Sequence, residues 1–226
     1  MFCYPVVFDT ILCCNKNYQE DAQEAAIRRR RISMATLDRP LVILLAGLSG
    51  SGKSTFAPYL AKALDGNVLD SDNLFDQPRV AVGSVLGIGT KIVDEPAWRD
   101  IVHGRLLNLF LSIASIAATT EHPIIAVSPW TGFRERPDLF GRARIGLASD
   151  FQWVIIRCKP ETRYQRICGR GREMDATKIN AGVVPDPQLM IPHGAIVVDT
   201  ESGVLQYPAL AEQVAARILE DATIMA

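Results

Sequence analysis

The sequence lacks an apolar run long enough to cross a membrane. Its longest apolar stretch, residues 106–118, is interrupted by Asn108, Ser112 and Ser115. It is also shorter than the roughly 20 residues that a membrane-spanning helix needs. A buried helix that crosses a sheet is the simpler interpretation. We therefore expect a protein without membrane spans.

Cysteine is scarce and shows no pairing pattern. The chain has five cysteines, an odd number, and the adjacent pair Cys13 and Cys14 is poorly spaced for binding one metal ion. Disulfide frameworks usually show an even count, and zinc sites show paired spacings such as Cys-x-x-Cys. The sequence therefore predicts free thiols in a reducing compartment, and hence a cytoplasmic location.

An excess of charge of one sign is also missing, because the formal net charge is −1. Such a chain has no overall basic field to attract nucleic acid. The run Arg28–Arg31 is a local exception, interpreted as a solvated helix end or disordered leader, or as a basic arm for nucleic acid or an anionic surface. We expect residues 1–38 to form an N-terminal extension and residues 39–226 to form one domain, since 226 residues suffice for one α/β core.

Apolar runs alternate with helix-like segments from residue 41 onward. Residues 41–46, LVILLA, form a continuous apolar run that is typical of a central parallel strand buried on both faces. Further strands are expected at residues 67–70, 123–128, 151–157 and 195–199, and helices are expected to begin near Ser54, Glu95, Pro137, Pro160 and Pro208. This alternation predicts an α/β fold of three layers with a central parallel sheet.

A glycine-rich loop follows the first expected strand and contains the P-loop pattern G-x-x-x-x-G-K-S. Glycines let backbone N–H groups approach phosphate oxygens, and the start of the next helix adds its positive end. Lys53 would contact the β- and γ-phosphates, and the Ser54 hydroxyl would bind Mg²⁺. The predicted nucleotide-binding residues of this loop are Gly47, Leu48, Ser49, Gly50, Ser51, Gly52, Lys53, Ser54 and Thr55.

Two classes of P-loop protein are disfavoured by missing motifs. A GTPase would have Asp-x-x-Gly directly after a strand and Asn-Lys-x-Asp downstream, but Asp138–Gly141 comes well after the strand ending at Ser128. The pair Asn15-Lys16 precedes the P-loop. A motor ATPase would have an acidic residue at the end of an apolar strand, where this chain has Ser-Pro-Trp. ATP is therefore expected rather than GTP.

Asp70 and Asp72 directly follow the second expected strand. In a parallel sheet they would lie at the carboxyl edge, next to the P-loop. We predict that Asp72 is the general base for an attacking hydroxyl and that Asp70 joins Ser54 at the Mg²⁺ site. A solvated turn is the alternative, because Asp, Ser and Asn favour turns.

Arginines recur after Pro160, at Arg163, Arg166 and Arg170, and would share one face of a continuous helix. Two interrupting glycines would give the segment mobility. An arginine-bearing lid of this kind would neutralise charge in the transition state and exclude water, with Arg172 contacting the nucleotide. A solvated basic face is the alternative. Catalytic roles are predicted for Lys53, Asp72, Arg166 and Arg170.

Taken in order, these motifs resemble those of the P-loop small-molecule kinases, with adenylylsulfate kinase nearest and gluconate kinases similar in layout. The segments that carry the resemblance are Gly47–Thr55, Leu69–Asn73, Ser128–Trp130 and Val198–Thr200. It implies transfer of the γ-phosphate of ATP to a hydroxyl of a small-molecule acceptor, with Mg²⁺ as cofactor.

The departures from adenylylsulfate kinase fall on its acceptor-binding positions. That family has an arginine soon after its Asp-x-Asp-Asn motif, where this chain has Leu74–Asp76. It has another arginine after its Ser-Pro-aromatic motif, where this chain has Thr131. Its lid is lysine-rich. The acceptor is therefore open, and residues 78–90 are expected to form its pocket with Trp98, Arg99 and Trp130.

Two other functions remain open. A kinase that acts on a macromolecule, such as an RNA end or a toxin-like target, would use the Arg28–Arg31 run. A nucleotide-dependent regulator would bind ATP without any acceptor.

Overall fold

The structure is a computed structural model that describes residues 39–87, 104–171, 175–183, 185 and 190–225. The predicted N-terminal extension, the expected helix start at Glu95, and Trp98, Arg99 and Arg172 lie outside the described residues. None of the described helices is both long and apolar enough to span a membrane.

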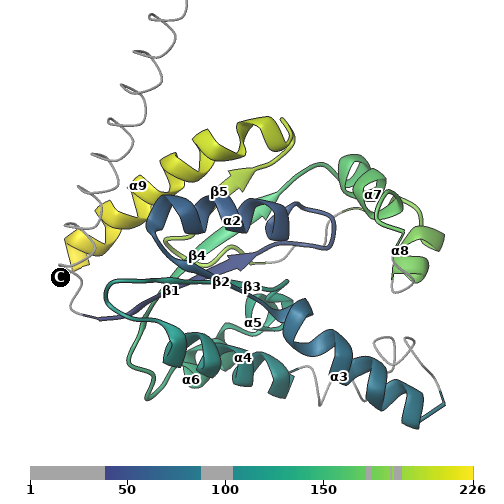
Figure 1. Ribbon diagram of the computed structural model, residues 1–226, viewed down its shortest axis with the longest axis horizontal. Coiled ribbons are helices and arrows are strands. Elements are labelled where there is room, and N and C mark those ends of the chain that lie inside the picture. Colours follow the sequence, from purple (N-terminus) through teal and green to yellow (C-terminus); the bar gives the residue numbers. More distant parts are fainter. Residues whose placement is uncertain (1–38, 88–103, 172–174, 184, 186–189, 226) are drawn as a thin grey trace, which may run out of the picture.

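A five-stranded parallel sheet forms the centre of the fold, in the order β2-β3-β1-β4-β5 (Figure 1). The strands are β1 (Leu41–Ala46), β2 (Asn67–Asp70), β3 (Ile124–Val127), β4 (Asp150–Arg157) and β5 (Ile196–Asp199). Each strand that the sequence predicts is present, and β1 and β2 have the predicted bounds.

Strand β1 is buried on both faces, as its continuous apolar run indicates. All six of its side chains are at most 5% exposed. Ile43 and Leu45 belong to the core beneath the helices α2 (Lys53–Leu64) and α9 (Tyr207–Met225). Alternate residues point to the opposite core, around the helix α4 (Gly104–Ala117). Each fully buried aliphatic side chain contributes about 1.5–3 kcal/mol to folding, so β1 anchors the loop that follows it.

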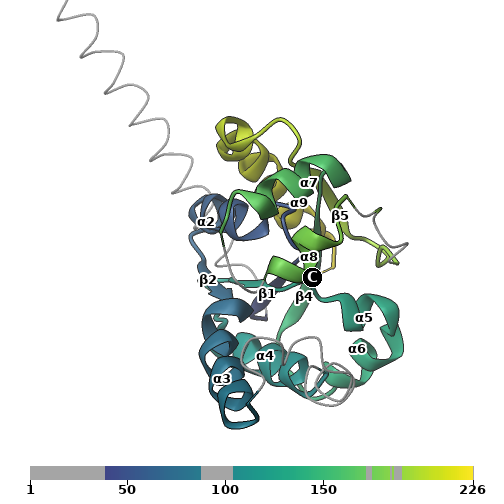
Figure 2. The same cartoon turned by 90° about the vertical axis from the view of Figure 1, so that its right-hand side faces the viewer.

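Helices cover the sheet on both faces, which confirms the predicted three-layer fold. Helices α2 and α9 lie on one face, and α4 lies on the other with the short helices α5 (Thr131–Glu135) and α6 (Pro137–Ala143) (Figures 1 and 2). Helices α7 (Pro160–Cys168) and α8 (Ala176–Asn180) follow β4 on the same side of the molecule as the P-loop (Figure 2). The short turn η4 (Val204–Gln206) leads into α9.

Helix α3 (Ser71–Val85) was not predicted, because its first residues favour turns and Pro78 lies inside it. The carboxylate of Asp70 explains its start. Oδ1 of Asp70 accepts a hydrogen bond from the backbone N–H of Asp72 at 2.9 Å, which caps the helix. The residues for which a solvated turn was the alternative interpretation thus begin a helix at the carboxyl edge of the sheet.

Trp130 is a core residue, and the expectation that it lines an acceptor pocket is wrong. Its side chain is fully buried. The ring stacks on Phe133 with centroids 5.7 Å apart and lies 5.3 Å from the ring of Phe110. Its indole N–H donates to the carbonyl oxygen of Ala126 at 3.0 Å. Because every part of this side chain is already packed or hydrogen-bonded, it fixes α5 against the sheet.

Candidate active site

The P-loop connects β1 to α2, and close packing constrains its backbone. Gly47, Gly50 and Gly52 have φ values of 154°, 83° and 98°, which L-residues rarely adopt. A Cβ at Gly47 would lie 2.5 Å from the carbonyl oxygen of Ile156, and one at Gly50 would lie 2.6 Å from that of Arg163. The glycines are therefore required by both conformation and space. The hydroxyl of Ser51 is buried inside the loop without a hydrogen-bond partner among the described residues, so the loop fits a phosphate chain.

Lys53 is the first residue of α2 and lies folded back over the loop. Its Nζ donates to the carbonyl oxygen of Leu48 at 3.0 Å. Burial lowers the pKa of Lys53 to about 8. The carboxylates of Asp72 and Asp70 oppose this shift, and the nearby charges of Arg170 and Lys178 add to it. The ammonium group thus lies in a pocket where a negative ligand would stabilise its charge.

Ser54 and Asp70 come together at the ends of α2 and β2. The Ser54 hydroxyl donates to Oδ2 of Asp70 at 2.8 Å. A hydroxyl beside a carboxylate is the kind of oxygen pair that Mg²⁺ binds next to a nucleotide. The structure thus places the two predicted metal-site residues in direct contact, and their chemistry fits this ion.

Asp72 lies in the first turn of α3, on the same edge of the sheet. Its carboxylate is 3.9 Å from the guanidinium of Arg79, which pairs more closely with Asp76 at 3.0 Å. Arg79 therefore brings a positive charge close to Asp72. The Asp72 side chain is 44% exposed, so a ligand can reach it.

Family membership is shown by residues 42–186, which match the AAA_33 family, described as an AAA domain. The chain belongs to the AAA_33 family. The matched region begins in β1 and includes the P-loop, α3, α5 and α7. It therefore contains all of the site residues described so far.

The chain is similar to a curated shikimate kinase of Corynebacterium glutamicum, with 38% identity over 60 residues. That match covers 26% of this chain and 34% of the relative. The chain thus spans about a third of that relative's length.

Two solved structures show the same fold. One is the APS kinase of Mycobacterium tuberculosis in complex with AMPPNP and APS, with a TM-score of 0.55 and 20% identity over 80% of this chain and 98% of the other. The other is the shikimate kinase of Acinetobacter baumannii in complex with shikimate, with a TM-score of 0.50 and 17% identity over 84% and 98% of the two chains. The predicted resemblance to P-loop small-molecule kinases is thus confirmed for the fold.

Arg166 stabilises the P-loop through hydrogen bonds that involve Thr200. Its guanidinium donates to the carbonyl oxygen of Thr200 at 2.7 Å and to the Thr200 hydroxyl at 3.2 Å. The buried Thr200 hydroxyl in turn donates to the carbonyl oxygen of Ser51 at 2.7 Å. These bonds tie the end of β5, α7 and the P-loop together, so Arg166 has a fixed position in this structure.

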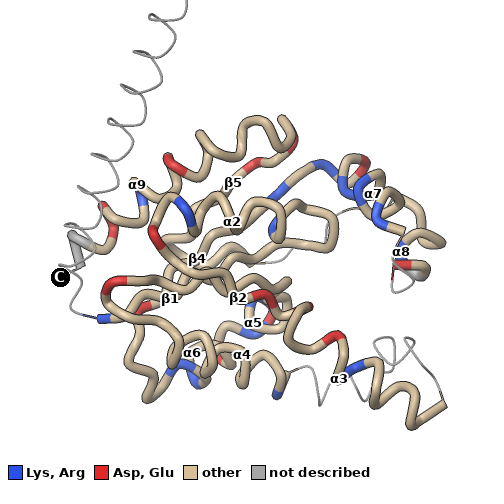
Figure 3. Tube along the Cα trace, viewed as in Figure 1, with Lys and Arg blue, Asp and Glu red and all other residues tan. Residues whose placement is uncertain are grey.

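Helix α7 ends at Cys168, so the continuous helix on which Arg163, Arg166 and Arg170 would share one face does not reach Arg170. Gly171, with φ of 60°, then turns the chain. Arg170 still lies near enough to Lys53 to lower its pKa. Basic positions follow one another along α7, whereas acidic positions mark the first turns of α3 (Figure 3). Besides burial, Asp72, Asp70 and Arg170 all affect the pKa of Lys53, so this lysine is close to both signs of charge.

Lys178, on α8, contacts the P-loop and was missed by the sequence analysis. Its Nζ donates to the Ser49 hydroxyl at 3.3 Å and to Asp175 at 2.7 Å. A cavity of about 330 Å³ lies beside this contact, lined by Leu48, Ser49 and residues of α7 and α8. The spacing of Asp175 and Lys178 by three residues was the available signal, but nothing in the sequence connects them to a loop so far away.

Arg134, on α5, is a buried cation that was likewise not assigned to the site. Its side chain is almost fully buried, and its Nε donates to the carbonyl oxygen of Met190 at 3.0 Å. Burial lowers its pKa, and so does the positive charge of Arg157, at the end of β4. Among the described residues no carboxylate forms an ion pair with Arg134.

Proposed function

We propose that this protein transfers the γ-phosphate of ATP to a hydroxyl group of a small-molecule acceptor. One observation carries the proposal: Lys53, the Ser54–Asp70 contact and Asp72 lie together at the carboxyl edge of the sheet. The 2.8 Å contact of Ser54 with Asp70 joins the P-loop side to the carboxylate side. A site for a nucleotide and a base for a hydroxyl are thus adjacent.

The residues supply three functions in this reaction. The P-loop amides and Lys53 hold the β- and γ-phosphates and balance their charge. Ser54 and Asp70 would hold Mg²⁺, which would neutralise charge on the phosphate oxygens. Asp72 accepts the proton of the acceptor hydroxyl. The hydroxyl oxygen of the acceptor bonds to the γ-phosphorus as the bond between this phosphorus and the ADP oxygen breaks.

Three alternatives have less support. The family's AAA description does not by itself indicate a motor, because β3 ends at Val127 and is followed by Ser128, Pro129 and Trp130 instead of a carboxylate. A nucleotide-dependent regulator would not need a base, whereas Asp72 is accessible at the edge of the site. For an acceptor that is a macromolecule, the run Arg28–Arg31 remains the sequence support.

An anionic acceptor agrees best with the charge of the site. Arg157 is the last residue of β4, and Arg134 lies on α5, which follows β3; these two strands flank β1, and Asp72 follows β2. Arg157 continues the β4 positions Trp153 and Ile155, which face the α4 side of the sheet where α5 also packs. A small molecule with a carboxylate, sulfate or phosphate group could place that group near the arginines and its hydroxyl near Asp72.

The test is to incubate the protein with γ-labelled ATP and a metabolite extract and to separate the products. A labelled small molecule, formed by the wild type and not by Asp72→Asn, would support the proposal and identify the acceptor. Release of labelled phosphate alone, at equal rates in both proteins, would contradict it. Label that appears in added RNA or protein would favour the macromolecular alternative.

A further inference from the structure

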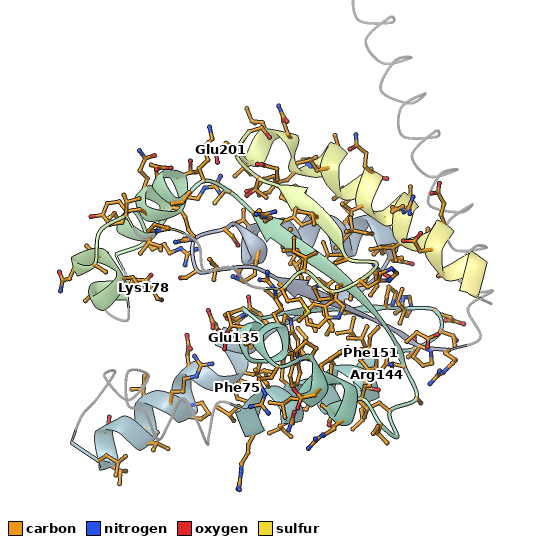
Figure 4. The ribbon with its side chains drawn as sticks, turned by 180° about the vertical axis from the view of Figure 1, so that it is seen from behind. Phe75, Glu135, Arg144, Phe151, Lys178 and Glu201 are labelled. Atoms are coloured by element: carbon orange, nitrogen blue, oxygen red, sulfur yellow. The ribbon has the colours of Figure 1, made fainter. Side chains whose placement is uncertain are left out.

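Lys178 makes a contact with the P-loop that the proposed reaction does not yet use. The residue lies on α8 (Figure 4), 129 positions from Ser49 in the sequence, and its Nζ is 3.3 Å from the Ser49 hydroxyl. Its side chain is 48% exposed, so the ammonium group is accessible to a ligand in the adjacent cavity.

Asp175 forms an ion pair with this ammonium group. Oδ1 of Asp175 is 2.7 Å from Nζ of Lys178, and the Asp175 side chain is only 4% exposed. Its Oδ2 atom is buried without a hydrogen-bond partner in the described part of the chain. A buried carboxylate with an unsatisfied oxygen is unfavourable by itself. The pair is thus unlike an ordinary surface ion pair, in which both charges remain solvated.

The contact lies at the end of the loop where a γ-phosphate would bind. The P-loop lysine reaches the β- and γ-phosphates, and Nζ of Lys53 is 3.0 Å from the carbonyl oxygen of Leu48. Ser49 is the next residue, so Lys178 approaches the loop from this same end. Its charge also helps to lower the pKa of Lys53, and both Ser49 and Lys178 line the 330 Å³ cavity.

We propose that Lys178 is a second phosphate-binding lysine that contacts the γ-phosphate, and that Asp175 is the positioning residue that holds it over Ser49. The inference rests on the ATP site of the proposed function and adds to it a means of distinguishing ATP from ADP. In this arrangement a nucleotide without a γ-phosphate would lack the contact with Lys178. Transfer of that phosphate therefore removes one contact with the nucleotide and favours release of the product.

The test is to measure the dissociation constants of ADP and of a non-hydrolysable ATP analogue by calorimetry. For Lys178→Met we expect the analogue to bind about tenfold more weakly, as expected for a lost hydrogen bond to a charged group, and ADP to change less than twofold. Lys178→Arg should keep most of the preference. The matched control is Lys62→Met, at an exposed lysine near the end of α2, which should bind both nucleotides like the wild type.

Asp175 is tested through its dependence on Lys178. Asp175→Asn should reduce the preference for the analogue over ADP in the wild-type background. It should have no further effect in the Lys178→Met background, because Asp175 acts through that lysine. The double variant also removes both charges of the pair, so it provides the same measurement if Lys178→Met alone does not fold.

Equal weakening of both nucleotides in folded Lys178→Met, or in the double variant, would overturn the proposal. A further loss of preference from Asp175→Asn in the Lys178→Met background would contradict the role of Asp175. These measurements need no acceptor. If the preference changes as expected while the extract gives no phosphorylated product, the transfer function fails and the γ-phosphate contact stands. If a product forms while the preference for the analogue over ADP is unchanged, the transfer function stands and the γ-phosphate contact of Lys178 fails.

Discussion

In the proposed reaction, the donor side of the site would come from one short segment, whereas the acceptor side would come from several distant ones. Nine consecutive residues, Gly47–Thr55, form the P-loop, and its glycines and the bonds from Arg166 and Thr200 fix its backbone. The proposed acceptor side would instead use Asp72 from α3 and Arg134 from α5. The contrast is between a backbone that local packing fixes and side chains that the fold brings together from separate helices.

The largest effect is expected on the donor side, from Lys53→Met. Removing the buried ammonium should lower kcat roughly 10²–10³-fold, because charge that develops on the phosphates loses its main side-chain donor. Turnover of labelled ATP with the identified acceptor is the measurement, with Lys62→Met as the control. Loss of less than tenfold would show that the loop amides alone supply donor-side stabilisation.

Asp70→Asn should have the next largest effect, because it removes a charge at the boundary between the two sides. Asparagine can still cap α3, so the change isolates the metal site. We expect Mg²⁺ affinity in the presence of ATP to fall roughly 10–100-fold, measured as the Mg²⁺ dependence of turnover. Asp65→Asn, in the turn after α2, is the matched control. Unchanged Mg²⁺ dependence in Asp70→Asn would remove Asp70 from this site.

Arg134→Met tests the acceptor side alone. The KM for the acceptor should rise about tenfold, as expected for a lost hydrogen bond to a charged group, while the affinity for ATP stays the same. Arg136→Met, at a neighbouring exposed arginine, should leave both values unchanged. If Arg134→Met weakens ATP and the acceptor equally, the two sides are not independent.

The pH dependence of nucleotide binding tests the donor side without any substitution. The pKa of Lys53 is lowered to about 8 in the free protein, and a bound phosphate favours the charged lysine. Below pH 8 the lysine is already protonated, whereas above pH 8 binding requires proton uptake. Affinity for the ATP analogue should therefore fall about tenfold between pH 7 and pH 9 by linkage. In Lys53→Met, titration calorimetry with the ATP analogue should show the same affinity at pH 7 and at pH 9.

The smallest effect is expected from Thr200→Val, which removes the hydroxyl that donates to the Ser51 carbonyl. The free energy of unfolding should fall by about 1 kcal/mol, which lowers Tm by about 2–4 °C in a protein of this size. Thermal unfolding followed by circular dichroism measures this change. An unchanged Tm would show that the bonds of Arg166 suffice to brace the loop.

The same contrast explains how much the sequence could predict. The strands and the P-loop were predictable because adjacent residues determine them: the continuous apolar run of β1 indicates burial on both faces, and the lysine and glycines of the loop define its ligand. The contact of Ser54 with Asp70 followed from the rule that the carboxyl ends of parallel strands meet at one edge.

The remaining contacts depend on segments that meet only in three dimensions. Lys178 reaches Ser49 because the chain turns after α7 and returns as α8, which no local pattern specifies. Helix α3 was missed because turn-forming residues also cap helices, and the capping by Asp70 is visible only in the structure. Trp130 was misplaced because its packing against Phe110 and Phe133 joins separate elements.

The measurement that tests the central claim most directly is the comparison of ATP binding and phosphoryl transfer in Asp72→Asn. The account predicts that this variant binds ATP with nearly wild-type affinity, because its P-loop is intact, and transfers no phosphate to the acceptor, because no base accepts the proton. Full turnover in Asp72→Asn would contradict the assignment of Asp72 as the base that joins the donor side to the acceptor side.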